Sequence, residues 1–198
     1  PDLLRLIEWA GKKGISLVID ESFVDFAKVK EKYSLLDNRI LADNPHLVVV
    51  KSISKSYGVP GFRLGVIASG NTEMIASVKK EVAIWNINSY GEFFMQILEK
   101  YHKDYTNACE SFRKERELFF KELQQVPFLE VFPSQANYFL CKVNGRLTSH
   151  ELALELLKHN ILIKDCSSKH GFDGAGYIRL AVRDRQDNEY LVKTLLSL

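Results

Sequence analysis

The stretch that decides the fold is Lys51-Ser-Ile-Ser-Lys-Ser-Tyr-Gly-Val-Pro-Gly-Phe-Arg-Leu-Gly65. It begins where a Leu-Val-Val-Val run in residues 46–51 ends, and such a run is typical of a strand buried in a parallel sheet. Ligands of open α/β sheets bind at the carboxyl ends of the strands, so we expect this stretch to border a ligand site. Its Gly-Val-Pro-Gly centre predicts an irregular loop, and Gly65 allows the backbone to pack closely.

Lys55 has the most distinctive chemistry in this stretch, because a lysine amine can attack an aldehyde and form a Schiff base. Ser52, Ser54 and Arg63 can donate the hydrogen bonds that a phosphate ester needs. The alternative is a solvated turn with incidental charges, which is the usual interpretation of an isolated Ser-x-x-Lys. The full spacing, directly after an all-valine strand, favours a ligand site.

A second motif, Val18-Ile-Asp-Glu-Ser-Phe-Val-Asp-Phe26, overlaps another short apolar run at residues 15–19. Asp20 ends this predicted strand, so we expect its carboxylate to project into the same crevice as Lys55. The alternative is an aspartate that caps the N-terminus of a helix, which is a common role after a strand. The lysine motif farther along the chain favours the functional role.

The lysine stretch closely resembles the cofactor-lysine motif of class I/II aminotransferases, Ser-x-Ser-Lys-x-x-Gly-x-x-Gly-x-Arg-x-Gly. The resemblance extends over essentially the whole chain, and it implies a fold-type I enzyme that uses pyridoxal 5'-phosphate (PLP). It implies that Lys55 carries PLP as a Schiff base, and that Ser52 or Ser54, together with Arg63, binds the cofactor phosphate. It also implies that Asp20 keeps the pyridine nitrogen of PLP protonated, which lets the ring act as an electron sink.

The segment around Phe23 bears on the branch of this superfamily. In the histidinol-phosphate aminotransferase branch the segment reads Asp-Glu-Ala-Tyr, and the tyrosine bonds the phenolic oxygen of the cofactor. Phe23 stands at that position and cannot donate a hydrogen bond, although Tyr57 is an alternative donor. The Asp-Glu-Ser-Phe-Val-Asp-Phe pattern is closer to the threonine-phosphate decarboxylase branch.

Near the C-terminal end, Tyr177-Ile-Arg-Leu-Ala-Val-Arg183 predicts a strand with two arginines. Strand alternation places Arg179 and Arg183 on the same face. An arginine binds a carboxylate through two parallel hydrogen bonds. The family resemblance implies that Arg179 binds the α-carboxylate of the substrate, and the alternative is a surface arginine on an edge strand.

The sequence predicts two domains. Residues 1–100 have the pattern of an α/β unit with a mostly parallel sheet, which the resemblance identifies as part of the PLP-binding large domain. A long amphipathic helix over residues 101–123 begins a small α+β domain, residues 101–198. The resemblance therefore implies the α/β fold class, as the C-terminal part of the PLP-dependent transferase fold.

Composition argues against several other classes. The 198 residues carry a formal net charge of +2 and no basic block, which argues against binding to nucleic acid or to an anionic membrane. No apolar run approaches the length that spans a bilayer. The three widely spaced cysteines predict reduced thiols in a cytoplasmic protein. The five histidines have no metal-ligand spacing, so we predict no metal site.

From these motifs we expect a PLP-dependent aminotransferase that acts on an amino acid and a keto acid, with a phosphorylated amino acid as a candidate substrate. Two alternatives stay open, namely decarboxylation of the threonine-phosphate type and a truncated domain without catalysis. The resemblance implies a homodimer in the full-length form. It also implies roughly as much sequence again before Pro1, so we predict that this chain is a C-terminal fragment that binds PLP weakly or not at all.

Overall fold

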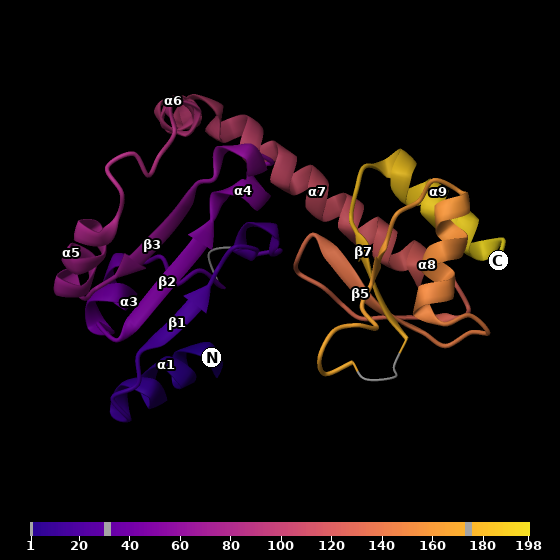
Figure 1. Cartoon of the computed structure of the whole chain (residues 1–198), viewed down its shortest axis with the longest axis horizontal. Coiled ribbons are helices and arrows are strands. Elements are labelled where there is room, and N and C mark those ends of the chain that lie inside the picture. Colours follow the sequence, from indigo (N-terminus) through magenta and orange to yellow (C-terminus); the bar gives the residue numbers. More distant parts are fainter. Residues whose placement is uncertain (1, 30–32, 173–175) are drawn as a thin grey trace. The chain divides into compact units, whose positions relative to one another are not determined.

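The computed structural model describes residues 2–29, 33–172 and 176–198 (Figure 1). The chain divides into two compact units between residues 107 and 108. The division falls within the 22-residue helix α7 (His102–Leu123), and each unit has a hydrophobic core of its own. None of the described helices is long and apolar enough to cross a membrane.

The first unit contains a three-stranded sheet in the order β1-β2-β3. Its strands are β1 (Leu17–Asp20), β2 (Leu47–Ser52) and β3 (Gly65–Ser69). β1 and β2 run parallel, and Asp20 at the end of β1 lies opposite Val50 of β2. The carboxyl ends of these two strands therefore meet at one edge of the sheet, as the two polar motifs predict.

β3 runs antiparallel to β2, with Gly65 opposite Ser52. This pairing departs from the expectation of a mostly parallel sheet. A parallel return needs a crossover that carries the chain back along the full length of the sheet. Residues 53–64 instead form α4 (Ile53–Ser56) and the 3-10 helix η2 (Pro60–Phe62), so the chain reverses at the end of β2 and returns beside it.

One face of this sheet packs against helices α1 (Asp2–Lys12) and α3 (Asn38–Asp43). Strand alternation sends every second side chain of β1 and β2 toward these helices. The contact forms the core of the first unit, whose buried members are Ile7, Leu35, Leu47 and Val49.

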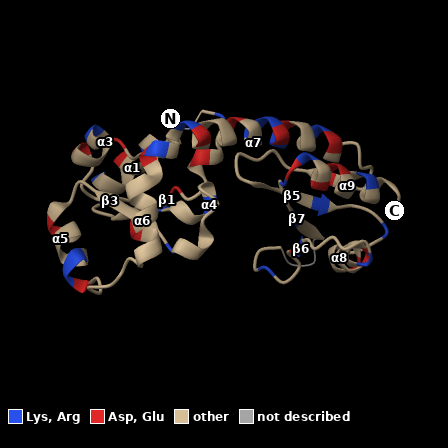
Figure 2. Ribbon diagram, turned by 90° about the horizontal axis from the view of Figure 1, so that it is seen from above, with Lys and Arg blue, Asp and Glu red and all other residues tan. Residues whose placement is uncertain are grey.

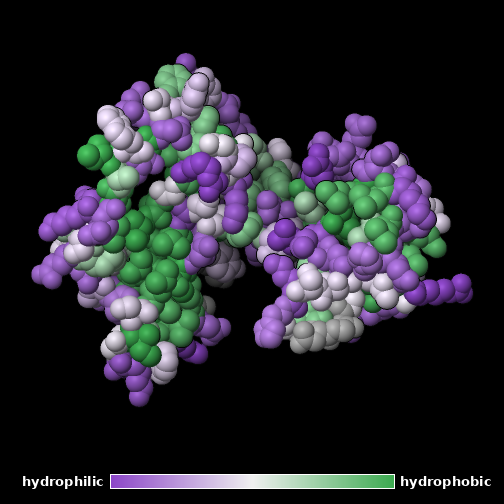
Figure 3. Space-filling model, in the orientation of Figure 1, coloured by the Kyte–Doolittle hydropathy of each residue, from purple (hydrophilic) through white to green (hydrophobic). Residues whose placement is uncertain are grey.

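Val18, Val50 and Ile67 lie on the opposite face of the sheet, as the strand register requires. Val18 is 61% exposed and Ile67 is 43% exposed. Figure 3 shows the resulting hydrophobic surface over these strands. The apolar runs predict a sheet that is covered on both faces, and this expectation is wrong for the described residues, whose helices cover only one face.

Asparagine caps start the two helices that follow β3. Asn71 precedes α5 (Thr72–Glu81), and Asn88 precedes α6 (Ser89–Ile97). In each case the side-chain oxygen accepts a hydrogen bond of 2.9 Å from a backbone N–H in the first turn of the helix. The short helix η3 (Leu98–Tyr101) then leads into α7.

The second unit contains a four-stranded antiparallel sheet in the order β4-β5-β7-β6. Its strands are β4 (Leu129–Val131), β5 (Tyr138–Val143), β6 (Lys164–Asp165) and β7 (Tyr177–Ala181).

One face of this sheet packs against helices α7, α8 (Ser149–Lys158) and α9 (Arg185–Leu196) and forms the core of the second unit. Helix and strand side chains interlock there, including Phe119, Leu123, Phe139, Leu152, Leu156, Ile178, Leu180 and Leu195. Burial in this core raises the pKa of the Cys141 thiol to about 12, so this cysteine stays protonated. The buried positions of β7 flank Arg179, which therefore lies on the face away from the core.

Charged side chains cover much of α7 (Figure 2), but Arg116 on this helix is buried. Its Nη1 donates to the backbone carbonyl oxygens of Gln135 at 2.7 Å and Ala136 at 3.2 Å. These bonds hold the loop that leads into β5. Helical periodicity predicts an apolar inner face for α7 and gives no sign of this buried arginine.

Asn188 closes the turn between β7 and α9, and its replacement tests how strongly this turn stabilises the second unit. The side chain is 1% exposed, accepts from the Arg183 backbone N–H at 3.0 Å, and donates to the Arg183 carbonyl at 2.9 Å and to Glu115 at 2.8 Å. Asn188→Ala leaves these partners unsatisfied, so we expect the free energy of unfolding to fall by about 1–3 kcal/mol.

Chemical denaturation followed by circular dichroism measures this change. The control is Gln186→Ala on an exposed position of the same helix, which should stay within about 0.5 kcal/mol of the parent protein. An Asn188→Ala loss no larger than that of the control would contradict the role of this turn.

Candidate active site

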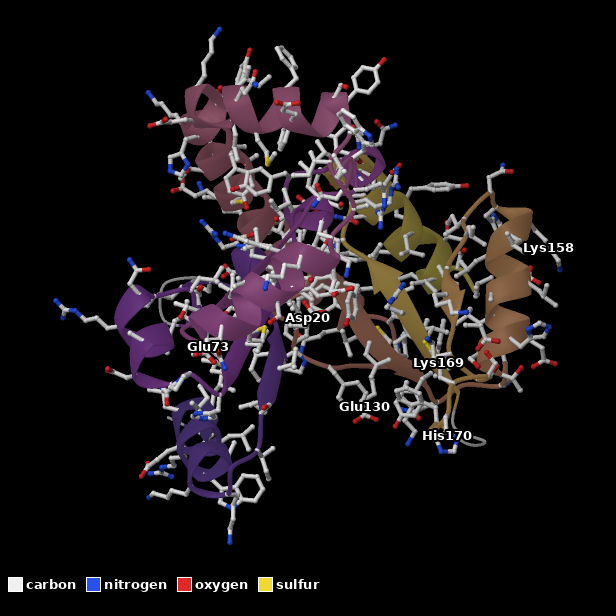
Figure 4. The ribbon with its side chains drawn as sticks, turned by 60° about the vertical axis from the view of Figure 1, so that its left-hand side comes forward. Asp20, Glu73, Glu130, Lys158, Lys169 and His170 are labelled. Carbon is white, nitrogen blue, oxygen red and sulfur yellow. The ribbon has the colours of Figure 1, made fainter. Side chains whose placement is uncertain are left out.

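Asp20 stands at the carboxyl end of β1 (Figure 4), and Ser22 holds its carboxylate. Oδ1 of Asp20 accepts hydrogen bonds from the Ser22 hydroxyl group and from the Ser22 backbone N–H at 2.8 Å. These two bonds, with a smaller contribution from the charge of Lys55, lower the pKa of the Asp20 carboxyl. Asp20 is therefore ionised at neutral pH and suited to bond a protonated ring nitrogen.

Ser22 also links the ends of β1 and β2. Its Oγ accepts a hydrogen bond from the backbone N–H of Ser52 at 3.0 Å. Asp20, Ser22, Ser52 and Arg63 all line one open hollow of about 490 Å³ at this end of the sheet. The structure thus places three of the expected residues around one space, and it adds Ser22, which the sequence motifs did not single out.

Lys55 lies in α4, and its Nζ is 4.2 Å from the centroid of the Phe23 ring. An ammonium group over an aromatic face is attracted by the quadrupole of the ring. Lys55 is not among the residues that line the hollow, and its charge makes only a small contribution to the lowered pKa of Asp20. Tyr57, the alternative hydroxyl donor, stacks on Tyr105 with ring centroids 4.0 Å apart.

The remaining two residues of the lysine stretch have different surroundings. Ser54 is buried and is not among the residues that line the hollow, whereas Ser52 is. Arg63 is exposed, and its Nη1 donates to the carbonyl oxygen of Pro60 at 3.1 Å. Its backbone has a φ of 55°, in the left-handed region, which costs a residue with a Cβ roughly 1–2 kcal/mol. The loop therefore holds Arg63 at the hollow in a constrained backbone conformation.

A buried ion pair beside the hollow escaped the sequence analysis. Lys51 Nζ lies 2.8 Å from Oδ1 and 2.7 Å from Oδ2 of Asp25, and the two side chains are 11% and 1% exposed. The sequence does contain a signal for it. Alternation along β2 places Lys51 on the same face as the core residues Leu47 and Val49, where a charge needs a partner.

Arg179 belongs to the second unit, on the exposed side of β7. Together with Lys164 and Asp165 it lines a hollow of about 750 Å³, and its guanidinium carbon is 4.9 Å from the centroid of the Tyr138 ring. Lys164 lies opposite Arg179 in the β6–β7 pairing, so two cationic residues border this hollow. Arg183 does not line it and forms an ion pair with an aspartate of α9.

The first unit therefore brings an amine, an ionised carboxylate, a hydroxyl group and a guanidinium group to one end of a sheet. The amine can react with an aldehyde, and the hydroxyl and guanidinium groups can bind a phosphate. Among the described residues, no group of three or more histidine, cysteine, aspartate or glutamate side chains is placed to hold a metal ion.

Known proteins match this chain over nearly its whole length. The model of the family described as aminotransferase class I and II matches residues 1–195. The chain is 34% identical over 200 residues to CMP-5'-(3-aminopropyl)phosphonate synthase of Streptomyces rubellomurinus, covering 100% of this chain and 31% of that protein. It is 30% identical over 195 residues to threonine-phosphate decarboxylase of Salmonella typhimurium, covering 98% of this chain and 52% of the relative.

A solved structure agrees with these sequence matches. Histidinol-phosphate aminotransferase from Clostridium acetobutylicum superposes with a TM-score of 0.88 and 26% sequence identity, over 98% of this chain and 57% of that one. The chain thus spans about half the length of the decarboxylase and the aminotransferase, and about a third of the phosphonate synthase.

Ser22→Ala tests the hydrogen bond that favours the ionised form of Asp20. Because the carboxylate loses one of its two donors, we expect the pKa of Asp20 to rise toward its ordinary value. A lowered pKa in the folded state stabilises the protein above the ordinary carboxyl pKa, and this contribution is lost as the pH falls through the lowered value. Ser22→Ala should therefore make the stability of the first unit less sensitive to acid.

A carbon-13 NMR titration of the carboxyl groups measures this change directly. Asp165 is an internal control, because it accepts similar hydrogen bonds from Ser167 and lies in the other unit. Its titration should be the same in both proteins. An Asp20 titration that is also unchanged in folded Ser22→Ala would disprove the role of Ser22.

Proposed function

The chain belongs to the class I and II aminotransferase family, and on this basis we propose that it carries the lysine-bearing part of an active site for phosphorylated amino acids. The family and its decarboxylase relatives depend on PLP. The observation that carries the proposal is that Asp20, Ser52 and Arg63 line one hollow where two parallel strands end, and that Lys55 lies in the helix directly after the second strand.

Four residues of the first unit have the chemistry to hold the cofactor. Lys55 would bind its aldehyde covalently, and Asp20 would accept a hydrogen bond from its pyridine nitrogen. Ser52 and Arg63, which line the same hollow as Asp20, would donate to its phosphate. When bound, PLP supplies a ring that withdraws electrons from the substrate Cα.

Lys55 would have a second role after the substrate amine has taken its place. Its amine would then stand close to the substrate Cα, where it can accept or deliver a proton. The Phe23 ring, 4.2 Å from Nζ, gives the released amine a defined resting place.

We propose a substrate with a carboxylate and a second anionic group. In this proposal Arg179 binds the carboxylate through two parallel hydrogen bonds. The names of the relatives support a phosphorus-containing group, since they refer to histidinol phosphate, threonine phosphate and an aminopropylphosphonate.

Decarboxylation is the reaction that we favour for this site. Phe23 brings no hydroxyl group toward Lys55, in keeping with the decarboxylase branch, and a relative with 30% identity is a decarboxylase. Amino transfer to a keto acid is the second candidate, and the TM-score of 0.88 to an aminotransferase supports it. The combined presence of Lys55, Asp20 and Arg63 argues against a domain without catalysis.

We further propose that the complete site needs more of the family fold than these 198 residues contain. The sheet face around Val18 and Ile67 is open among the described residues, and Lys55 is exposed. We therefore expect the isolated chain to bind PLP weakly or not at all. For the full-length form we propose a homodimer whose ligands are small amino acids, joined by keto acids if the reaction is amino transfer.

Lys55→Ala tests the covalent role of the lysine. In the natural protein that contains this chain, PLP should produce a visible absorbance band, and borohydride should trap the cofactor on the Lys55 peptide. Both signals should disappear in Lys55→Ala, because Lys51, which also lines the hollow, is paired with Asp25. Both should persist in Lys79→Ala, an exposed lysine of α5. Trapping of PLP on a different lysine of the parent protein would overturn the assignment.

Product analysis distinguishes the two reactions. We expect the PLP-loaded natural protein to release carbon dioxide from O-phosphothreonine or O-phosphoserine without forming a keto acid. A keto acid together with pyridoxamine phosphate would favour amino transfer instead. If a folded, PLP-loaded protein gave neither product with these substrates and histidinol phosphate, the proposed substrate class would be wrong.

A further inference from the structure

Two chain segments meet beside the site, and three different contacts join them. A hydrogen bond, an ion pair and a cation–π contact connect residues 22–25, which follow β1, with residues 51–55 at the end of β2. The hydrogen bond orients Ser22, as described above. The ion pair joins Lys51 to Asp25, and the cation–π contact joins Lys55 to Phe23.

The Lys51–Asp25 ion pair is unusual because both side chains are almost completely removed from water. Both carboxylate oxygens of Asp25 lie within 2.8 Å of the ammonium group, so the pair has little freedom to turn. Removing two charges from water is costly, and an apolar pair of similar volume is often at least as stable. Stability alone therefore does not explain an ion pair at this position, whereas a requirement for defined geometry does.

The ion pair is connected through the backbone to Phe23, whose ring contacts Lys55. Lys51 lies opposite Val66 in the β2–β3 ladder, so the sheet fixes its backbone. Asp25 lies in the short helix η1 (Val24–Phe26), and Phe23 is the residue directly before this helix. The ion pair thus fixes η1, and with it the Phe23 ring, relative to the end of β2.

The Lys55 side chain is long and exposed, so it can adopt many conformations unless a contact such as the one with Phe23 restricts it. It lies four residues after Lys51, in the four-residue helix α4 that follows β2, and its ammonium group is 4.2 Å from the Phe23 centroid. Cation–π attraction falls off with distance from the ring, so it requires the ring to stay in place.

We propose that Lys51 and Asp25 are positioning residues for Lys55, because their ion pair holds Phe23 where its ring receives the Lys55 ammonium group. This inference rests on the proposed function only for the cofactor role of Lys55. The consequence is that the amine returns to one place whenever it is not bonded to the cofactor. A well-placed amine reacts faster than one that samples many positions.

The test measures the position of the Lys55 amine without the cofactor. Lysines of the natural protein are methylated reductively with carbon-13 formaldehyde, which preserves their positive charge. Methyl groups above a ring face resonate upfield, so the Lys55 signal should lie upfield of the other lysine signals. Lys55→Arg assigns this signal by removing it, and Phe23→Leu should return it to the ordinary lysine position.

Asp25→Asn and Lys51→Met are the decisive variants. Each should move the Lys55 methyl signal most of the way to its position in Phe23→Leu, while Lys51→Arg should restore the upfield position because it keeps the ion pair. Since a single unpaired buried charge can unfold the protein, the double variant Asp25→Leu with Lys51→Met replaces the pair by apolar groups. This double variant should be folded and should still lose the upfield signal.

The matched control is the exposed ion pair Glu8–Lys12, with an Nζ to Oε1 distance of 2.5 Å. Glu8→Gln should leave the Lys55 signal unchanged. An unshifted Lys55 signal in folded Asp25→Asn or in the folded double variant would overturn the proposal.

A second measurement separates this inference from the proposed function. In Asp25→Asn and in the double variant, covalent attachment of PLP to Lys55 should be about tenfold slower than in the parent protein. If the parent protein forms no adduct at Lys55, the proposed function fails, whatever the methyl signals show. If the adduct forms at the same rate in all variants and the methyl signal does not move, only the positioning role fails.

Discussion

The parallel pairing of β1 with β2 is the interaction on which the candidate site depends. It places Asp20 opposite Val50, and the backbone N–H of Glu21 extends the pairing by donating to the Val50 carbonyl at 2.8 Å. Both polar segments therefore leave the sheet from the same edge and in a fixed register. Because the two backbones are close at this edge, the Ser22 hydroxyl group can bond both the Asp20 carboxylate and the Ser52 backbone N–H.

Several polar side chains near this edge are buried, and they form hydrogen bonds or ion pairs with protein groups instead of with water. Glu21 is buried, and its carboxylate accepts from the Ser34 hydroxyl at 2.9 Å and from the Leu35 backbone N–H. Lys51 and Asp25 do the same for each other. These buried contacts restrict the conformations that the segment after β1 can adopt.

The two units differ in how far they bury their own apolar surface. The second unit encloses a core between three helices and one face of its sheet, and Arg179 lies on the other face. The first unit covers one face of its sheet and leaves Val18 and Ile67 exposed on the other. The decarboxylase and aminotransferase relatives are about twice as long as this chain, and an apolar sheet face of this kind is suited to pack against further parts of their fold.

The sequence by itself determined the family, the lysine motif after a strand, Asp20 at a strand end and the arginine strand, because these features depend on residue type and on local spacing along the chain. Tertiary structure decided the antiparallel return of β3, the position of Ser52 rather than Ser54 on the hollow, and the pairing of Lys51 with Asp25. Those features depend on which segments meet across the sheet and on which side chains lose contact with water. Local periodicity reports which faces are apolar, but not which distant group will satisfy a buried charge.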